Sequence, residues 1–228
     1  MILGEKYNEE LKYFVAVDCV IFGYEDDELK LLLYPRRFEP HYKEWSLMGG
    51  FVQPDESCDA AAQRVLQLTV GLTDIYLEQI GGFSAPNRDP GGRVVSVAYY
   101  ALVKINEYKK SVVSEYGGRW FTLNKTPNLV LDHGKMVDEA LSKLRLKATY
   151  ELVGKELLPE KFTLTQLNNL YNAIFQKTFD QGNFRKKLAS LKALEQTGEK
   201  DTSNSKRGAY YYKFKQNSTE NFDRIVKY

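Results

Sequence analysis

The 228-residue chain is poor in cysteine and in long apolar runs, and each shortage excludes a class of protein. Its two cysteines, Cys19 and Cys58, are isolated and lack the spacing of zinc ligands, which favours a reduced, cytoplasmic protein. No segment approaches the ~18 to 20 apolar residues of a membrane span. The start, MILGEKYNEE, is too acidic for a signal peptide. A hydrophobic content of 43% is ordinary for a soluble globular protein, so we expect no membrane partner.

Charge is nearly balanced overall but is unevenly distributed along the chain. The net charge of the whole sequence is +2. Residues 160–228 nevertheless carry 13 lysines and arginines against 7 acidic side chains, whereas the preceding part is acidic. A basic segment behind an acidic one suggests that the second part binds a polyanion, although a solvated basic surface would give the same composition.

The segment GFVQPDESCDAAAQRVLQLTVGL (residues 50–72) has a regular spacing of glycine, acidic, basic and apolar residues. The positions that set this spacing are Gly50, Glu56, Arg64, Leu66, Gly71 and Leu72. The spacing resembles the Nudix box, with which Nudix hydrolases hold Mg²⁺ or Mn²⁺ against a diphosphate. This resemblance implies a Nudix-like fold for the first part of the chain.

The box lacks the three glutamates that follow its arginine, and Val65, Leu68 and Thr69 stand in their places. On a helix these positions span one turn, so glutamates there would present three carboxylates to one ion. Hard divalent cations need several carboxylate oxygens, and valine and leucine offer none. The sequence therefore predicts no metal site, no cofactor and no hydrolase activity, with Glu56 and Arg64 left to form a structural pair.

Local patterns predict a mixed sheet with two helices in the first part. Apolar, β-branched segments indicate strands at residues 13–24, 29–34, 75–83 and 93–105. Helices are expected at 56–69 and 132–146. The first of them has Asp55 or Ser57 as its N-cap and Gly71 at its end. This order of elements is compatible with an α/β fold of the Nudix-like αβα sandwich type.

The second part carries the pattern of a helix-turn-helix. Thr163 and Gln166 form a capping box in front of a helix with apolar spacing from Leu164 to Phe175. A polar turn at 180–183 precedes a second helix, and two helices joined by a short turn with glycine are typical of this motif.

The residues after the two helices predict a wing. Residues 209–215 alternate as a half-exposed strand and would pair with residues 194–196. The polar loop at 198–208 between them is expected to be disordered. The fold class expected for this part is therefore a winged helix-turn-helix domain.

Basic residues lie on the two elements with which winged helices bind DNA. Arginine suits the O6 and N7 atoms of guanine, whereas lysine mostly neutralises phosphate. We therefore interpret the second helix as a recognition helix for double-stranded operator DNA, the alternative being a solvated basic face. The expected DNA-binding residues are Thr165, Asn183, Arg185, Lys186, Lys187, Lys206 and Arg207.

The first part is expected to retain a pocket although it has lost its metal ligands. Asp18 lies within an apolar strand, where a carboxylate is costly unless it meets a partner or a polar ligand. Trp45 either stacks on a sugar or base or belongs to the core, and His133 either contacts a ligand or is a helix cap or satisfied surface residue. The residues expected to bind a ligand there, the effector if the protein is a regulator, are Asp18, Arg37, Trp45, Glu56, Asn87, Arg93 and His133.

Six segments together resemble the Nudix-related transcriptional regulators over almost the full chain. They are VDCVIF (17–22), WSLMGGFV (45–52), the box frame, NRDPGGRVVSVAYYAL (87–102), LVLDH (129–133) and NFRKKL (183–188). The resemblance implies a Nudix-like effector domain at 1–155 and a winged helix-turn-helix domain at 156–228. It also implies a homodimeric repressor of transcription whose partners are operator DNA and a small-molecule effector.

Within this family the sequence is most similar to the sugar-responsive regulators of arabinose use in Bacteroides-type bacteria. That similarity implies a sugar effector, L-arabinose, in a catalytically inactive pocket. Two alternatives come from other classes. One is a Nudix hydrolase of ADP-ribose or another nucleoside diphosphate derivative, with ligands such as Glu56 and Glu78, and the other is an RNA-binding or scaffolding module.

Overall fold

The first part of the chain is built around the long strand β1 (Phe14–Glu25), which is buried from Ala16 to Gly23. The computed structural model describes residues 10–73, 75–105, 117–203, 207–215 and 224–226. β1 pairs in parallel with β6 (Val94–Lys104) and antiparallel with β2 (Glu28–Pro35) and β4 (Met48–Phe51). Because both faces of β1 are covered, apolar residues occupy nearly every position of the strand instead of alternating with polar ones.

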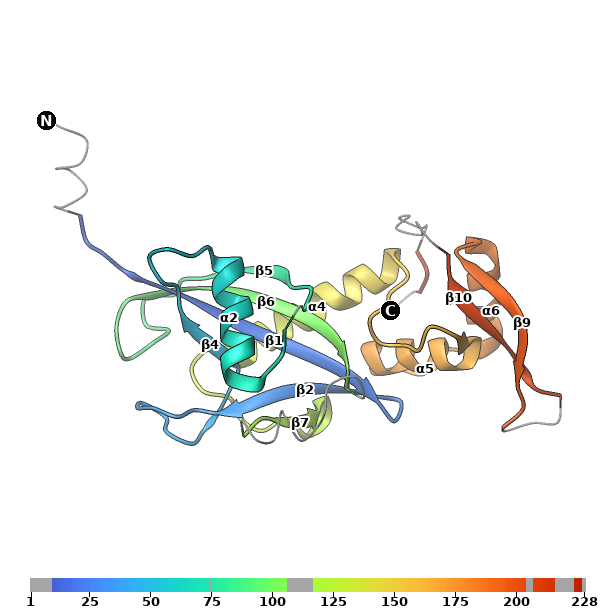
Figure 1. The fold of residues 1–228 in the computed structure, drawn as a ribbon, viewed down its shortest axis with the longest axis horizontal. Helices are drawn as coiled ribbons and strands as arrows, with labels where there is room; N and C mark the ends of the chain where they lie inside the picture. The colour runs from blue at the N-terminus through green and yellow to red at the C-terminus, as the bar shows by residue number, and fades with distance from the viewer. Residues whose placement is uncertain (1–9, 74, 106–116, 204–206, 216–223, 227–228) are drawn as a thin grey trace, which may run out of the picture.

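Further strands extend this mixed sheet on either side of β1. β3 (Trp45–Ser46) and β7 (Arg119–Thr122) pair with β2, and the short 3₁₀ helix η2 (Leu123–Lys125) follows β7. On the other side, β5 (Glu78–Phe83) pairs with β6. Helices α2 (Cys58–Val70) and α4 (His133–Tyr150) cover the two faces of the sheet (Figure 1). The expected αβα sandwich is confirmed.

The helix boundaries follow from their caps. The Ser57 side chain accepts a hydrogen bond from the Ala60 amide at the start of α2, so Ser57 rather than Asp55 is the N-cap. Gly71 ends α2 in the left-handed conformation, with φ of 70°. α4 continues to Tyr150, four residues beyond the end expected at 146. Within the described residues, no helix has both the length and the apolar character needed to cross a bilayer.

The second part is a winged helix-turn-helix, as expected. Helix α5 (Leu164–Phe175) begins with the predicted capping box, in which Thr163 N donates to Gln166 Oε1 and Gln166 N donates to Thr163 Oγ1. Helix α6 (Gln181–Leu191) follows. The three-stranded sheet beside them has the order β8 (Phe162–Thr163), β10 (Ala209–Phe214) and β9 (Leu194–Asp201).

Two local expectations for this part are wrong. The turn expected at 180–183 is instead the start of α6, because the Asp180 side chain caps the helix by accepting a hydrogen bond from Asn183 N at 2.8 Å. The loop expected to be disordered from residue 198 is strand as far as Asp201. Cross-strand pairing with Tyr210 and Ala209 of β10 holds this polar segment in the wing.

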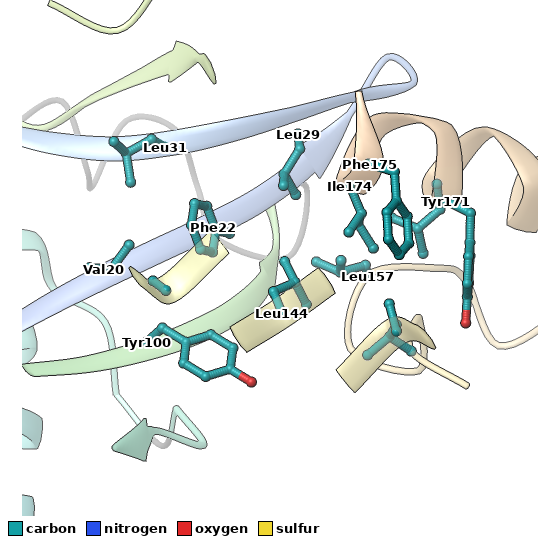
Figure 2. Close-up of a cluster of buried hydrophobic side chains, with 14 of the residues drawn as sticks. Val20, Phe22, Leu29, Leu31, Tyr100, Leu144, Leu157, Tyr171, Ile174 and Phe175 are labelled. Carbon is teal, nitrogen blue, oxygen red and sulfur yellow. The ribbon is translucent and has the colours of Figure 1, made fainter. Parts of the chain in front are cut away.

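One hydrophobic cluster continues from the first part of the chain into the second. It contains Phe22 and Leu29 of the sheet, Leu144 of α4, and Ile174 and Phe175 of α5. Figure 2 shows the Leu29 side chain of β2 close to those of α5, with Leu157 of the connecting segment between α5 and Leu144. The winged helix is therefore packed onto the end of the sheet where β1 turns into β2 (Figure 1).

Polar contacts reinforce this junction. Arg145 Nε of α4 donates to the carbonyl oxygen of Ile174 at 2.9 Å, near the C-terminal end of α5. Asn169 Nδ2 of α5 donates to Asp27 Oδ2 in the β1–β2 turn at 2.8 Å. The carbonyl groups in the last turn of a helix lack partners within the helix, so Arg145 satisfies one of them from the neighbouring domain.

Candidate functional site

A cavity of about 290 Å³ lies between the end of β2, the box loop and the start of α4. Its lining combines charged and aromatic side chains, namely Arg36, Arg37, Arg88, Asp18, Asp89, Tyr34, Phe38 and Phe51. The box contributes Gly50 and Thr69, and Gly49 directly before the box also lines the cavity. The cavity thus offers guanidinium groups and aromatic faces in the place where the Nudix-like box meets the sheet.

A buried network of hydrogen bonds and ion pairs surrounds Asp18, which is 6% exposed. Ser96 Oγ donates to Asp18 Oδ2 at 2.6 Å, and Arg88 Nη2 lies 3.5 Å from the same oxygen. Arg88 also donates through Nε and Nη2 to both oxygens of Asp132, at 2.9 and 2.7 Å. These partners compensate the desolvation of the carboxylates and fix the start of α4 against β1.

The position of the proton on His133 follows from its neighbours. The Leu47 amide donates to His133 Nδ1 at 3.1 Å, which leaves the proton of the neutral ring on Nε2. Nε2 lies 3.5 Å from Asp18 Oδ1. Burial lowers the pKa of His133, although Asp18 and Asp132 act in the opposite direction. His133 is therefore neutral near pH 7 and turns its N–H toward Asp18.

Gly49 is required by the close approach of the box to Asp18. A Cβ atom at Gly49 would collide with the Asp18 carboxylate and would lie 3.1 Å from the carbonyl oxygen of Val17. A Cβ atom at Gly50 would lie 2.9 Å from Val65 Cγ2. The glycine pair thus lets β4 lie directly over Asp18 and α2.

The positions that would hold a divalent cation in the box do not fit one. Val65 is buried in the core on the α2 face, Leu68 is 64% exposed, and Thr69 Oγ1 donates to the carbonyl oxygen of Val65 at 2.6 Å. None of the three supplies a carboxylate. In the part of the chain that the structure describes, no group of three histidine, cysteine or acidic side chains is arranged to hold a metal ion.

Glu56, the acid of the box that remains, is fully engaged in the box loop. Arg64 Nε donates to Glu56 Oε2 at 2.9 Å, and the Gln53 amide donates to Glu56 Oε1 at 2.9 Å. The hydrogen bond from Arg64, followed by that from Gln53, lowers the pKa of Glu56 to about 2. Arg64 Nη2 also donates to the carbonyl oxygen of Phe51 at 2.9 Å, so this pair holds the loop against α2.

Glu78, the second ligand considered for a hydrolase, does not lie with Glu56. Tyr100 donates through its hydroxyl to Glu78 Oε2 at 3.0 Å, and Lys147 forms an ion pair with the other oxygen. Glu78 lines a separate cavity of about 320 Å³ next to the C-terminal end of α4. The acids proposed for hydrolysis are therefore not assembled in one site.

The structure brings three of the expected effector-binding residues together. Asp18, Arg37 and His133 line the cavity described above. Sequence reasoning missed two neighbours, Arg36 and Phe38, which lie on either side of Arg37 at the end of β2. The basic and aromatic run before Trp45 was the available signal for both residues.

The other expected effector-binding residues lie outside the cavity lining. The Trp45 ring packs edge-on against Phe121, with 4.8 Å between ring centroids, so the core alternative describes it better than stacking on a ligand. Glu56 belongs to the loop pair with Arg64. Asn87 is exposed, and Arg93 Nη1 donates to the carbonyl oxygen of Ala85 at 3.4 Å.

The expected DNA-binding residues that the structure describes lie on α5, α6 and the wing. Asn183, Arg185 and Lys186 are exposed on α6, and Lys187 is half-buried. Arg185 Nη2 donates to Thr165 Oγ1 of α5 at 3.0 Å, which places both helices at one groove. Arg207 is exposed in the wing, whereas Lys206 lies outside the described residues.

Comparisons with known proteins match both parts of the chain. Residues 12–140 match the model of the NUDIX domain, and residues 154–214 match that of the NrtR DNA-binding winged helix domain. The ADPR responsive transcriptional repressor NtrR of Acinetobacter baylyi is 32% identical over 219 residues, which cover 94% of this chain and 87% of that protein.

Solved structures show the same arrangement. Shewanella oneidensis NrtR complexed with a 27mer DNA aligns with a TM-score of 0.82 and 30% identity, covering 93% of this chain and 99% of that one. The NUDIX domain of Shewanella oneidensis NrtR complexed with ADP ribose aligns with a TM-score of 0.52 and 28% identity, covering 63% of this chain and 99% of that one.

The fold and the two family matches define a Nudix domain joined to a DNA-binding winged helix. Because the similarity to a repressor with both domains extends over nearly the whole chain, this protein belongs to the NrtR-type family of Nudix-related transcriptional regulators. The expected membership in the Nudix-related regulators is confirmed. The comparisons give no support to an arabinose-utilisation regulator as the nearest relative.

Proposed function

We propose that this protein is a transcriptional repressor that binds operator DNA through its winged helix and ADP-ribose through its Nudix pocket. The observation that carries this proposal is the full-length similarity to NrtR in complex with DNA, together with a preserved cavity in the Nudix domain. In this proposal the cavity beside Asp18 is the effector site, and the exposed side of α6 and the wing is the DNA site.

The chemistry of the cavity favours ADP-ribose over L-arabinose. Arg36 and Arg37 suit an anionic diphosphate, whereas a neutral pentose needs no guanidinium group. Phe38 and Phe51 are 59% and 52% exposed beside the cavity, where an aromatic base can stack on them. Relatives named for ADP-ribose support the same choice.

On the DNA side, we assign base contacts to the first turns of α6 and phosphate contacts to its flanks. Asn183 and Arg185 project from the N-terminal half of the helix, which is the part of a recognition helix that reaches base edges. We assign phosphate contacts to Thr165 and to the exposed side chains of Lys186 and Arg207. A homodimer on a two-fold symmetric operator, acting in the cytoplasm, completes the proposal.

We further propose that the Nudix domain binds its effector without cleaving it. The support is chemical, since Glu56 is held by Arg64 and the positions of the other box acids carry Val65, Leu68 and Thr69. A hydrolase would release AMP from ADP-ribose in the presence of Mg²⁺ or Mn²⁺. Chromatography after prolonged incubation with either metal should recover the ADP-ribose intact.

The central test measures DNA affinity as a function of effector. The protein is titrated at fixed salt onto genomic fragments that it has itself selected, and binding is followed by fluorescence anisotropy. ADP-ribose should weaken the complex, while L-arabinose and ribose should leave its Kd unchanged. Equal DNA affinity with and without ADP-ribose would refute the assignment of ADP-ribose as the effector. A response to L-arabinose alone would instead support a sugar effector.

The DNA-binding surface is tested by removing two charges from it. The double variant Arg185→Ala with Lys187→Ala should weaken operator binding by about 1 to 3 kcal/mol or more, with folding unchanged by circular dichroism. The control variant, Lys125→Ala with Lys135→Ala, removes two exposed charges from the Nudix domain. Equal losses in both variants would mean that overall charge rather than α6 determines binding.

A further inference from the structure

Nudix sites commonly hold a diphosphate through a divalent cation, and the residues of this pocket do not fit that arrangement. Thr69 lines the cavity, but its hydroxyl donates to the Val65 carbonyl, and the Glu56 carboxylate accepts from Arg64 and Gln53. Leu68 points its apolar side chain to solvent. A diphosphate in this cavity therefore needs another source of positive charge.

Arg36, directly after β2, lines this cavity with a guanidinium group. Its Nε donates to the carbonyl oxygen of Pro40 at 2.6 Å, and its guanidinium carbon lies 4.1 Å above the Phe38 ring centroid. The backbone on either side is also fixed, since Arg36 N donates to the Glu44 carbonyl oxygen at 2.9 Å and Lys43 N donates to that of Arg36 at 2.8 Å. The guanidinium plane is thus oriented by Pro40 and Phe38 before any ligand arrives.

The two acids that line the cavity, Asp18 and Asp89, have partners other than Arg36. Asp18 is compensated by Ser96 and Arg88, and Asp89 Oδ1 accepts a hydrogen bond from the Gly91 amide at 2.7 Å. Among the residues lining the cavity, three arginines (Arg36, Arg37 and Arg88) face two acids (Asp18 and Asp89), and Arg88 offsets the charge of Asp18, so the lining as a whole attracts an anion. A guanidinium group can bind two phosphate oxygens at once and so can take the place of a metal ion between the protein and a diphosphate.

We propose that this pocket binds the diphosphate of its effector directly through Arg36, with Arg37 beside it, and requires no divalent cation. This inference rests on the proposed function, because it concerns the same cavity. It identifies Arg36 as the group that replaces the metal charge of a Nudix hydrolase.

The test is calorimetric titration of ADP-ribose into the full-length protein, once with excess EDTA and once with MgCl₂. The expected Kd is the same in both buffers. Binding that appears only with MgCl₂ overturns the inference and leaves the effector assignment standing. Absence of binding in both buffers overturns the effector assignment and this inference with it.

Two variants, both titrated in the EDTA buffer, test which side chain supplies the positive charge that binds the diphosphate. Arg36→Gln removes the guanidinium group and should weaken ADP-ribose binding at least about 10-fold, because hydrogen bonds to charged groups are involved. Lys43→Gln is the matched control, since it removes one exposed charge from the same loop, and its Kd should equal that of the wild type. Unfolding temperatures of both variants verify folding. Equal Kd values for Arg36→Gln and Lys43→Gln would overturn the role of Arg36.

Discussion

The hydrophobic cluster that joins the two domains should make the chain unfold as one cooperative unit, and Leu144→Ala tests this expectation. Leu144 is completely buried in α4, in the same cluster as Leu157, Ile174 and Phe175. If these side chains form a real common core, neither domain retains its packing once the other has unfolded. The boundary near residue 155 would then separate two folding patterns rather than two independent units.

The size of the effect follows from the burial of Leu144. Truncating a fully buried leucine to alanine removes transfer free energy and leaves a cavity, at a cost of about 2 to 5 kcal/mol. For a chain of this size, 1 kcal/mol lowers the unfolding temperature by about 2 to 4 °C. Leu144→Ala should therefore lower it by roughly 4 to 20 °C.

Differential scanning calorimetry measures this effect, with Leu66→Ala as the matched control. Leu66 is also completely buried, but it lies in the separate cluster under α2. The wild type should unfold in a single transition, and each variant should shift that transition as a whole. Two resolved transitions in the wild type, with Leu144→Ala shifting the first domain alone, would refute the common core.

Two further predictions concern the network at the start of α4 and the contact at its end. Because the pKa of His133 is lowered from 6.5 in the folded state, the unfolded chain binds more protons as the pH falls below 6.5, so stability decreases there, by up to about 1.4 kcal/mol per pH unit. His133→Asn keeps an acceptor for the Leu47 amide but does not titrate. In chemical denaturation at a series of pH values, the unfolding free energy of this variant should fall less steeply below pH 6.5 than that of the wild type. An unchanged slope would mean that another group causes the decrease. Arg145→Met removes the hydrogen bond to the Ile174 carbonyl. In anisotropy titrations this variant should still bind DNA and ADP-ribose, but ADP-ribose should change its DNA affinity less than in the wild type. An undiminished effect of ADP-ribose would contradict a role for this contact.

The elements that the sequence predicted well are those determined by neighbouring residues. Ser57 and Gly71 bound α2, and Thr163 with Gln166 starts α5, because each cap is a contact within one helical turn. The start of α6 carried the same kind of signal, since Asp180 and Asn183 have N-cap spacing, but the glycine between them suggested a turn. The length of β9 in the wing was underestimated, because its polar composition gives no sign of the cross-strand pairs with β10 that hold it.

The candidate site was predicted less well because its geometry depends on distant contacts. A partner for Asp18 was expected from the cost of a buried carboxylate, yet Ser96 and Arg88 come from parts of the chain more than sixty residues away. The Trp45 ring meets Phe121 across the β2–β7 region, which no local pattern reveals. The expectation of L-arabinose came from family resemblance and from the missing box acids, whereas the three arginines that line one cavity come from separate segments of the chain and favour an anionic ligand.

The same helix runs from the cavity of the proposed effector site to the winged helix, which gives the proposed effector response a physical route. α4 has 18 residues and so spans about 27 Å. Asp132 and His133 at its start belong to the network beside the cavity, and Arg145 near its end holds the last turn of α5. We expect a ligand that shifts Asp18 or Arg88 to move the start of α4, and the packed cluster between α4 and α5 to transmit that movement to α5. Because binding free energies are reciprocal, operator DNA that favours one position of α5 must then lower the affinity of the pocket for a ligand that favours the other.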